Sequence, residues 1–173
     1  MVSIEKNITS VKQRIEQAAA QAGRDPNSIK LLAVSKTRPI NDIQVAYKAG
    51  LNALGENYVK EATDKIKSLE TLGAEWHFIG PLQSNKTRPV TEHFDWVHSV
   101  DRIKIAKRLS EQRPEHLPPL NICLQINIDA EPSKSGVLPE QAIDLALRVS
   151  QLPNVRLRGL MAIPRACDTL EAQ

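Results

Sequence analysis

The chain has 173 residues, of which 41% are hydrophobic and 25% charged, and its formal net charge is +3. This length and hydrophobic content suit one domain that buries a core of its own. The small net charge and the 3% aromatic content exclude a nucleic-acid surface built from basic patches and stacked rings.

Membrane, disulfide and metal-binding classes are also disfavoured. No segment is apolar for long enough to span a bilayer, and the first residues alternate charge with isoleucine instead of forming a signal peptide. The two cysteines, Cys123 and Cys167, lie in no CxxC pair. His93, His98 and His116 show no metal-ligand spacing. We therefore expect a cytoplasmic protein with no membrane partner and no bound metal.

Segments typical of helices and strands alternate along the chain. The first, Ile4 to Ala22, carries apolar residues at helical spacing and ends at Gly23. Short apolar runs then predict strands at 31–35, 52–55, 76–79, 96–100, 120–128 and 157–163, with helices around 43–49, 59–72, 84–90, 103–109 and 139–152. Because no linker interrupts this alternation, we predict a single α/β domain, residues 1–173, with a parallel sheet.

Two parallel architectures fit this pattern, a doubly wound open sheet and a barrel. The turn after the first predicted strand, Ser35 to Pro39, contains no glycine, whereas doubly wound nucleotide-binding sheets usually have a glycine-rich turn there. Polar residues also follow the strand ends, where barrel proteins build their sites. We therefore predict a (β/α) TIM-type barrel preceded by an N-terminal helix, with about six of the usual eight βα units.

Lys36 is the main candidate for a functional residue. It follows the apolar run Leu31 to Val34, which predicts a strand buried on both faces, and strand alternation places Lys36 on the face of Leu32 and Val34. Apolar surroundings disfavour the charged form of a lysine, so more free amine is left to attack an aldehyde as a Schiff-base nucleophile. The alternative, a solvated lysine that closes a strand, stays open on these residues alone.

Five blocks, in order over almost the whole chain, resemble the pyridoxal phosphate homeostasis protein family. The blocks are LLAVSKT (31–37), GENYV (55–59), WHFIGPLQSNK (76–86), VHSVDR (97–102) and RGLMAIP (158–164). The resemblance implies a fold similar to the barrel domain of alanine racemases, and pyridoxal 5′-phosphate (PLP) held on the lysine matching Lys36. Family members continue through two further strands that grip the cofactor phosphate, so we expect the barrel in this chain to be incomplete at its C-terminus.

Asn57, His77 and Met161 are further candidate cofactor-binding residues. The resemblance places Asn57 near the pyridoxal ring, although an asparagine in a turn also satisfies its own backbone. Strand alternation could aim His77 into the barrel near Lys36, or His77 could be a buried histidine satisfied by a neighbour. Met161 could contact the ring or belong to the core.

Two further groups of basic residues have a less defined role. Lys86 and Arg88 form a small basic patch that suits either an anion or a solvated helix face. Lys134 lies in the loop SKSG (133–136), which recurs in the family, and its sequence context explains no role for it.

Three functions fit these residues. The first is a PLP-binding protein that holds the cofactor on Lys36 without turnover and supplies PLP-dependent apoenzymes, as a monomer in its full-length form. The second is a racemase-like isomerase, which needs acid-base groups on both faces of the substrate, and Tyr47 and Tyr58 are the only tyrosines. The third is a cofactor-free aldolase, for which Glu56 has no evident partner. We therefore favour PLP homeostasis by binding, with no catalytic residue.

Overall fold

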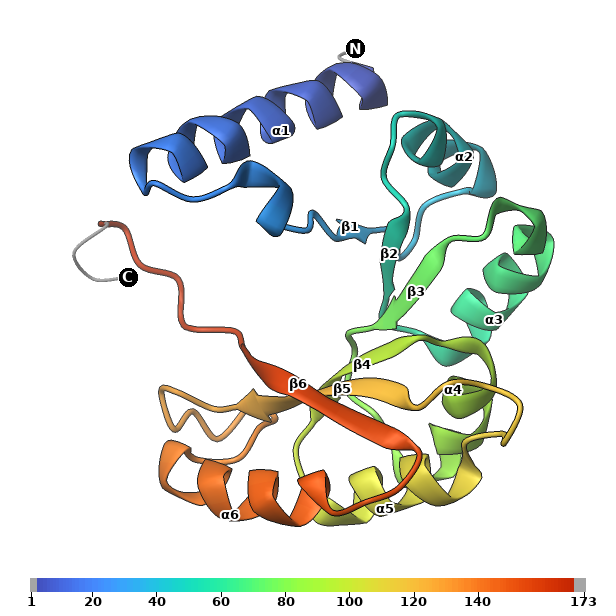
Figure 1. The fold of residues 1–173 in the computed structure, drawn as a ribbon, viewed down its shortest axis with the longest axis vertical. Helices are drawn as coiled ribbons and strands as arrows, with labels where there is room; N and C mark the ends of the chain where they lie inside the picture. The colour runs from blue at the N-terminus through green and yellow to red at the C-terminus, as the bar shows by residue number, and fades with distance from the viewer. Residues whose placement is uncertain (1–2, 170–173) are drawn as a thin grey trace. The chain divides into compact units, whose positions relative to one another are not determined.

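The computed structural model describes residues 3–169. The chain divides into two compact units, Met1–His77 and Phe78–Gln173. In each unit strands alternate with helices, and the strands lie in the sheet in the order in which they occur in the sequence (Figure 1). This alternation confirms the predicted α/β class, while the prediction that residues 1–173 form one domain stays a prediction.

The first unit contains three helices and three strands. They are α1 (Ile4–Gln21), β1 (Ala33–Val34), α2 (Ile40–Lys48), β2 (Ala53–Glu56), α3 (Val59–Ser68) and β3 (Glu75–Phe78, which ends in the second unit), with the short 3₁₀ turns η1 (Pro26–Ser28) and η2 (Glu70–Leu72). Ser3 caps α1 by accepting a hydrogen bond from the Lys6 N–H at 3.3 Å. Gly73 ends η2 with a φ of 64°, a left-handed conformation that only glycine adopts without a steric cost.

Strand β1 is shorter and less buried than the sequence predicts. Only Ala33 and Val34 form the strand, and Val34 is 50% exposed, so the prediction of a strand buried on both faces was wrong. The buried face is the one that carries Ser35, which is 5% exposed. Among the residues that the structure describes, the opposite face, with Val34 and Lys36, stays open to solvent.

The second unit contains η3 (Ser84–Lys86), α4 (Thr87–His93), β4 (Trp96–Val100), α5 (Ile103–Gln112), β5 (Leu120–Ile126), α6 (Pro139–Ser150) and β6 (Val155–Ala162). Strands β4, β5 and β6 are parallel, and β5 pairs with β6 from Leu120 opposite Val155 to Ile126 opposite Ala162. Helices α5 and α6 lie side by side against these strands (Figure 1). The core between the layers is apolar and includes Val97, Ile105, Leu109, Ile122, Leu124 and Leu145.

Three further observations concern membrane helices, metal sites and the buried cysteine. Within residues 3–169, no helix has the length and apolar character needed to cross a membrane. In the same range, no cluster of three or more His, Cys, Asp or Glu side chains is placed to hold a metal ion. Burial raises the pKa of the Cys123 thiol, as expected for a core cysteine that does not react.

Candidate functional site

Lys36 and Asn57 follow the ends of two neighbouring parallel strands. Ala33 lies opposite Leu54 and Val34 opposite Gly55. This pairing extends one residue further, since the Ser35 N–H donates a hydrogen bond to the Gly55 carbonyl at 2.9 Å. Continuing the same register places Lys36 beside Asn57. Two of the polar residues predicted at strand ends therefore follow neighbouring strands at the same end of the sheet.

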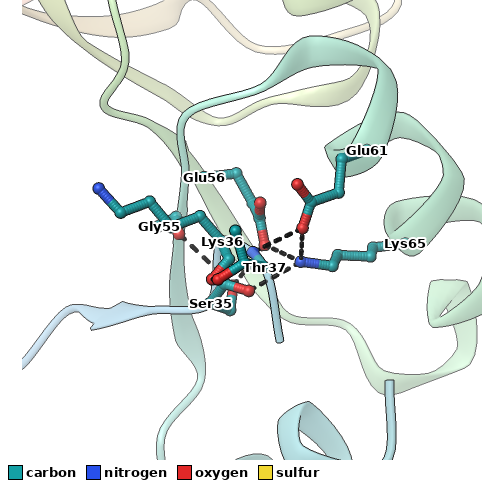
Figure 2. A network of polar contacts seen from close by, with 7 residues as sticks. All are labelled: Ser35, Lys36, Thr37, Gly55, Glu56, Glu61 and Lys65. Carbon is teal, nitrogen blue, oxygen red and sulfur yellow. Dashed lines mark hydrogen bonds and ion pairs between the residues drawn. The ribbon is translucent and has the colours of Figure 1, made fainter. Parts of the chain in front are cut away.

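The Lys36 side chain is exposed and its amine is unengaged. Among residues 3–169, no hydrogen bond or ion pair holds its Nζ. Figure 2 shows the side chain reaching away from the polar network that surrounds its backbone. The predicted apolar surroundings of Lys36 are not found, because the face of β1 that carries Val34 and Lys36 is open in the described part of the chain. The amine is instead accessible to a reactant from solvent.

Lys65, on α3, is the centre of that network. It is only 6% exposed, and its ammonium donates to the Ser35 carbonyl at 2.7 Å and to two carboxylates, Glu56 Oε1 at 2.8 Å and Glu61 Oε1 at 2.6 Å (Figure 2). A lysine ammonium has three donors, so all of them are used. The Ser35 hydroxyl donates to the same Glu56 oxygen at 2.7 Å. The network therefore joins the ends of β1 and β2 to α3.

Thr37, the residue after Lys36, has a strained backbone. Its φ of 62° lies in the left-handed region, which costs a non-glycine residue roughly 1 to 3 kcal/mol and is least favourable for a β-branched one. The Thr37 N–H donates to Glu61 Oε1 at 2.7 Å, and its hydroxyl donates to the Lys36 carbonyl at 2.6 Å. The backbone groups on both sides of Lys36 are therefore bound to the Glu61–Lys65 pair.

The two carboxylates of the network differ in their surroundings. The hydrogen bond from Lys65 is the main reason why the pKa of Glu61 lies below its ordinary value of 4.5; burial opposes this shift, and the Thr37 N–H supports it. Glu56 is fully buried. Its Oε1 accepts two hydrogen bonds, but its Oε2 has no partner among the described residues. A buried oxygen without a hydrogen-bond partner lowers the stability of the folded protein, so the network is not fully satisfied.

Asn57 also carries an unpartnered acceptor. Its Oδ1 is buried, and no described residue donates a hydrogen bond to it. An asparagine that stabilises its own turn uses this oxygen as the acceptor, so that alternative does not account for Oδ1. The structure therefore leaves this buried acceptor unsatisfied.

His77 is buried beside an acidic residue of its own strand. Its Nε2 lies 2.5 Å from Glu75 Oε1, and Lys30 Nζ donates to the same oxygen at 2.7 Å. Burial, the largest influence on Glu75, raises its pKa, but the hydrogen bonds from Lys30 and His77 and their charges outweigh it, so the net shift is downward. His77 therefore fits the alternative of a buried histidine satisfied by a neighbour, and a role for it toward a cofactor stays a prediction.

Three candidate residues lie in the second unit. Met161 is half-buried in β6, opposite Gln125 of β5, and its contact with a cofactor ring stays a prediction. Lys86 and Arg88 are both exposed, with the buried Thr87 between them. Both side chains are solvated, which agrees with the solvated alternative, and residues two positions apart do not share one face of a helix.

The loop that contains Lys134 is held by its own contacts. Lys134 Nζ lies 2.9 Å from Glu131 Oε2, and Asn127 Nδ2 donates to the Glu131 carbonyl at 2.8 Å. Gly136 has a φ of 126°, and a Cβ there would lie 2.7 Å from the Asn127 backbone nitrogen. Only glycine fits at this position, which explains part of the loop's sequence but assigns no chemistry to Lys134.

Sequence reasoning missed Lys65 and Glu61. Their spacing of four residues is typical of an exposed helical ion pair, which carries no functional signal. One signal pointed to burial: Lys65 follows Ala62 by three residues and precedes Leu69 by four, so all three lie on the same helix face. A lysine on the apolar face of a helix is rare unless it is paired.

Comparisons with known proteins identify the family. The family model described as "Alanine racemase, N-terminal domain" matches residues 5–173. The pyridoxal phosphate homeostasis protein of Pseudomonas aeruginosa is 59% identical over 173 residues, which are 100% of this chain and 75% of that protein. This chain belongs to the pyridoxal phosphate homeostasis protein family. The Escherichia coli K12 member is 54% identical over 167 residues, which are 95% of this chain and 71% of that member.

Solved structures agree with this assignment. PipY of Synechococcus elongatus, solved with PLP bound, matches at a TM-score of 0.76 and 39% identity over 91% of this chain and 74% of PipY. Alanine racemase of Corynebacterium glutamicum matches at a TM-score of 0.58 and 18% identity over 77% of this chain and 38% of the racemase, a likeness of fold alone. The family and these folds confirm the predicted barrel-type fold class and the resemblance carried by the five sequence blocks.

Proposed function

We propose that this protein binds PLP as a Schiff base on Lys36 and holds it for intracellular PLP homeostasis without catalytic turnover. The observation that carries the proposal is the exposed Lys36 amine, which no described residue engages, between two anchored backbone neighbours. The names of the relatives and the PLP bound to PipY support it. In this proposal the protein acts as a monomer, and PLP-dependent apoenzymes are the recipients of the cofactor.

The residues at the edge of β1 and β2 fit the cofactor chemically. PLP supplies an aldehyde that an amine can attack. The neutral Lys36 amine donates its electron pair to the carbonyl carbon, a carbon–nitrogen bond forms, and the two amine hydrogens leave with the carbonyl oxygen as water. The unpartnered Oδ1 of Asn57 offers an acceptor for a donor group on the cofactor. Lys36 and Asn57 are therefore the residues that would hold it.

The surroundings of the two tyrosines support binding without turnover. Racemisation needs one acid-base group on each face of the substrate. The Tyr47 hydroxyl donates to the Leu72 carbonyl, so it is committed to the fold. Tyr58 is 56% exposed and lacks the burial that tunes a catalytic base.

A titration with PLP tests the covalent step. We expect wild-type protein to develop the visible absorbance band of a Schiff base, and Lys36→Ala to abolish it. Lys36→Arg should fail as well, because a guanidinium stays protonated and cannot form the bond. Lys60→Ala is the matched control, since Lys60 is a 95% exposed lysine of the same unit. An unchanged band in Lys36→Ala would contradict the proposal.

A racemisation assay tests the absence of turnover. Protein loaded with PLP should interconvert the alanine enantiomers no faster than PLP alone, because neither Tyr47 nor Tyr58 is placed as the second base in the described part of the chain. Turnover that disappears in Lys36→Ala would favour the racemase-like function instead.

A further inference from the structure

We propose that Glu61 and Lys65 position Lys36 for its reaction with the aldehyde, an inference that rests on the proposed function. Neither side chain touches the Lys36 amine. Lys65 holds the carbonyl of Ser35, and Glu61 holds the N–H of Thr37 (Figure 2). The pair therefore acts through the backbone on both sides of the lysine.

The reacting amine needs such support because its own side chain provides none. Lys36 Nζ stands at the end of a flexible four-carbon chain, and no described residue restrains it. Its location therefore depends on the direction in which the backbone presents Cα and Cβ. Rotation about the backbone at Ser35 or Thr37 would change the direction in which the side chain leaves the strand and so move the amine. Fixing the two flanking peptides reduces that freedom.

The strained backbone of Thr37 indicates that its hydrogen bonds hold the chain in an unfavourable conformation next to Lys36. A β-branched residue at a φ of 62° keeps that conformation only when surrounding contacts impose it. Two hydrogen bonds hold it: the Arg38 N–H donates to the Ser35 carbonyl at 3.1 Å and closes a turn over Lys36 and Thr37, and the Thr37 N–H donates to Glu61 Oε1 at 2.7 Å. The same oxygen accepts from Lys65 Nζ at 2.6 Å, so one atom links the anchor of Thr37 to the anchor of Ser35.

An ion pair that only stabilised its own helix would not need contacts with residues outside that helix. An ordinary Glu–Lys pair four residues apart lies on the helix surface and contacts only its own helix. Lys65 is instead 6% exposed, and it reaches a carbonyl 30 positions away in the sequence. Another hydrogen bond from the Lys65 ammonium goes to the fully buried Glu56 of β2. The contact with the Ser35 carbonyl ends next to Lys36, and the contact with Glu56 ends at the strand beside it. Both partners lie outside α3.

Two ligands and two variants of Glu61 separate positioning from stability. PLP can bond to Lys36, whereas pyridoxine 5′-phosphate carries an alcohol in place of the aldehyde and cannot. Glu61→Ala removes the acceptor for the Thr37 N–H, and Glu61→Gln keeps a carbonyl oxygen in its place. Lys60→Ala, an exposed change on the same helix, is the control. Equilibrium affinities are measured at a temperature where circular dichroism shows every variant to be folded.

Glu61→Ala should weaken PLP binding about tenfold, the loss typical of one hydrogen bond to a charged group, and should change the affinity for pyridoxine 5′-phosphate less than twofold. Glu61→Gln should restore most of the PLP affinity. Equal weakening for both ligands, or for neither, would overturn the positioning role. A wild-type protein that binds PLP no more tightly than the alcohol and develops no absorbance band would overturn the proposed function instead.

Discussion

Each unit of the protein buries one basic side chain as the centre of a hydrogen-bond network, and the two networks differ in their partners. In the second unit, Arg113 is 5% exposed and donates to three carbonyls, those of Thr91 at 2.6 Å, Phe94 at 2.8 Å and Pro118 at 2.8 Å. In the first unit, Lys65 donates to one carbonyl and two carboxylates. Both side chains use their donors inside the protein. The hydrogen bonds of Arg113 end at carbonyls, with the charge of Asp95 nearby, whereas Lys65 forms direct ion pairs with two carboxylates.

In the proposed function, this difference separates a structural role from a functional one. Arg113 satisfies carbonyls at the end of α4 and in the loop before β5, as a residue that stabilises the fold does. The partners of Lys65 hold the backbone on both sides of an exposed, unengaged lysine and include a carboxylate oxygen without a partner. A buried cation whose partners are carbonyls stabilises the fold. A buried cation whose network holds the backbone around an unengaged lysine is a candidate part of a functional site.

The largest expected difference between the two networks is in the free energy of unfolding. Lys65→Met should destabilise the protein by about 3 to 5 kcal/mol, because it leaves the buried carboxylate of Glu56 without a cation. Arg113→Met should cost about 2 to 3 kcal/mol, since the groups that lose a hydrogen bond are carbonyls and no ion pair is broken at hydrogen-bond distance. Urea denaturation measures both values.

PLP titration of the same two variants sharpens the result. Where both proteins are folded, Lys65→Met should weaken PLP binding and Arg113→Met should not. Equal loss of PLP affinity in the two variants would remove the distinction between a site and a structural contact.

A smaller difference should appear as the pH falls. The folded-state pKa of Glu61 lies below its ordinary value of 4.5, mainly because of the Lys65 hydrogen bond. Its contribution to stability is therefore present above pH 4.5 and is lost as the pH falls through the folded pKa. Urea midpoints measured from about pH 6 down to about pH 3 should show this loss in wild-type protein and less of it in Glu61→Gln.

The control for this pH series is Arg113→Met. Because no carboxylate of the Lys65 network is altered, the variant should keep the wild-type pH dependence at a lower overall stability. A Glu61→Gln variant with the full wild-type slope would show that Glu61 does not contribute to it.

The smallest expected effect concerns Thr37. Glycine adopts a φ of 62° freely, whereas alanine incurs most of the left-handed cost. Thr37→Gly should therefore be more stable than Thr37→Ala by about 0.5 to 1 kcal/mol, the reverse of the order found at most positions. Thermal unfolding of the two variants checks the sign. If alanine is the more stable replacement, the left-handed conformation of Thr37 is not a cost that the anchor offsets.

Much of the fold could be predicted because local patterns determine it. The predicted strand 96–100 coincides with β4. The helix predicted around 59–72 is shorter in the structure: α3 ends at Ser68, and the rest is the turn η2, which Gly73 ends with a positive φ. The apolar run at 31–34 gave a misleading prediction of burial. An apolar run indicates that at least one face of a strand is buried, but it does not show which residues of the chain pack against the other face.

The candidate site could be predicted only in part. Lys36 was singled out because it follows the apolar run 31–34, and its role stays a prediction. The strand alternation that separates it from buried Ser35 is confirmed. The network around it could not be found, because Lys65 contacts Ser35 and Glu56 across 30 and 9 positions of the sequence. A local pattern of Glu and Lys contains no information about partners that only the fold brings near.

Borohydride trapping followed by peptide mapping tests the central claim most directly. Reduction fixes any Schiff base between PLP and a lysine, so the modified residue can be identified by mass spectrometry. The account predicts a single cofactor adduct on Lys36 in wild-type protein and in Lys60→Ala, and none in Lys36→Ala. An adduct that persists in Lys36→Ala, or that spreads evenly over the exposed lysines, would contradict it.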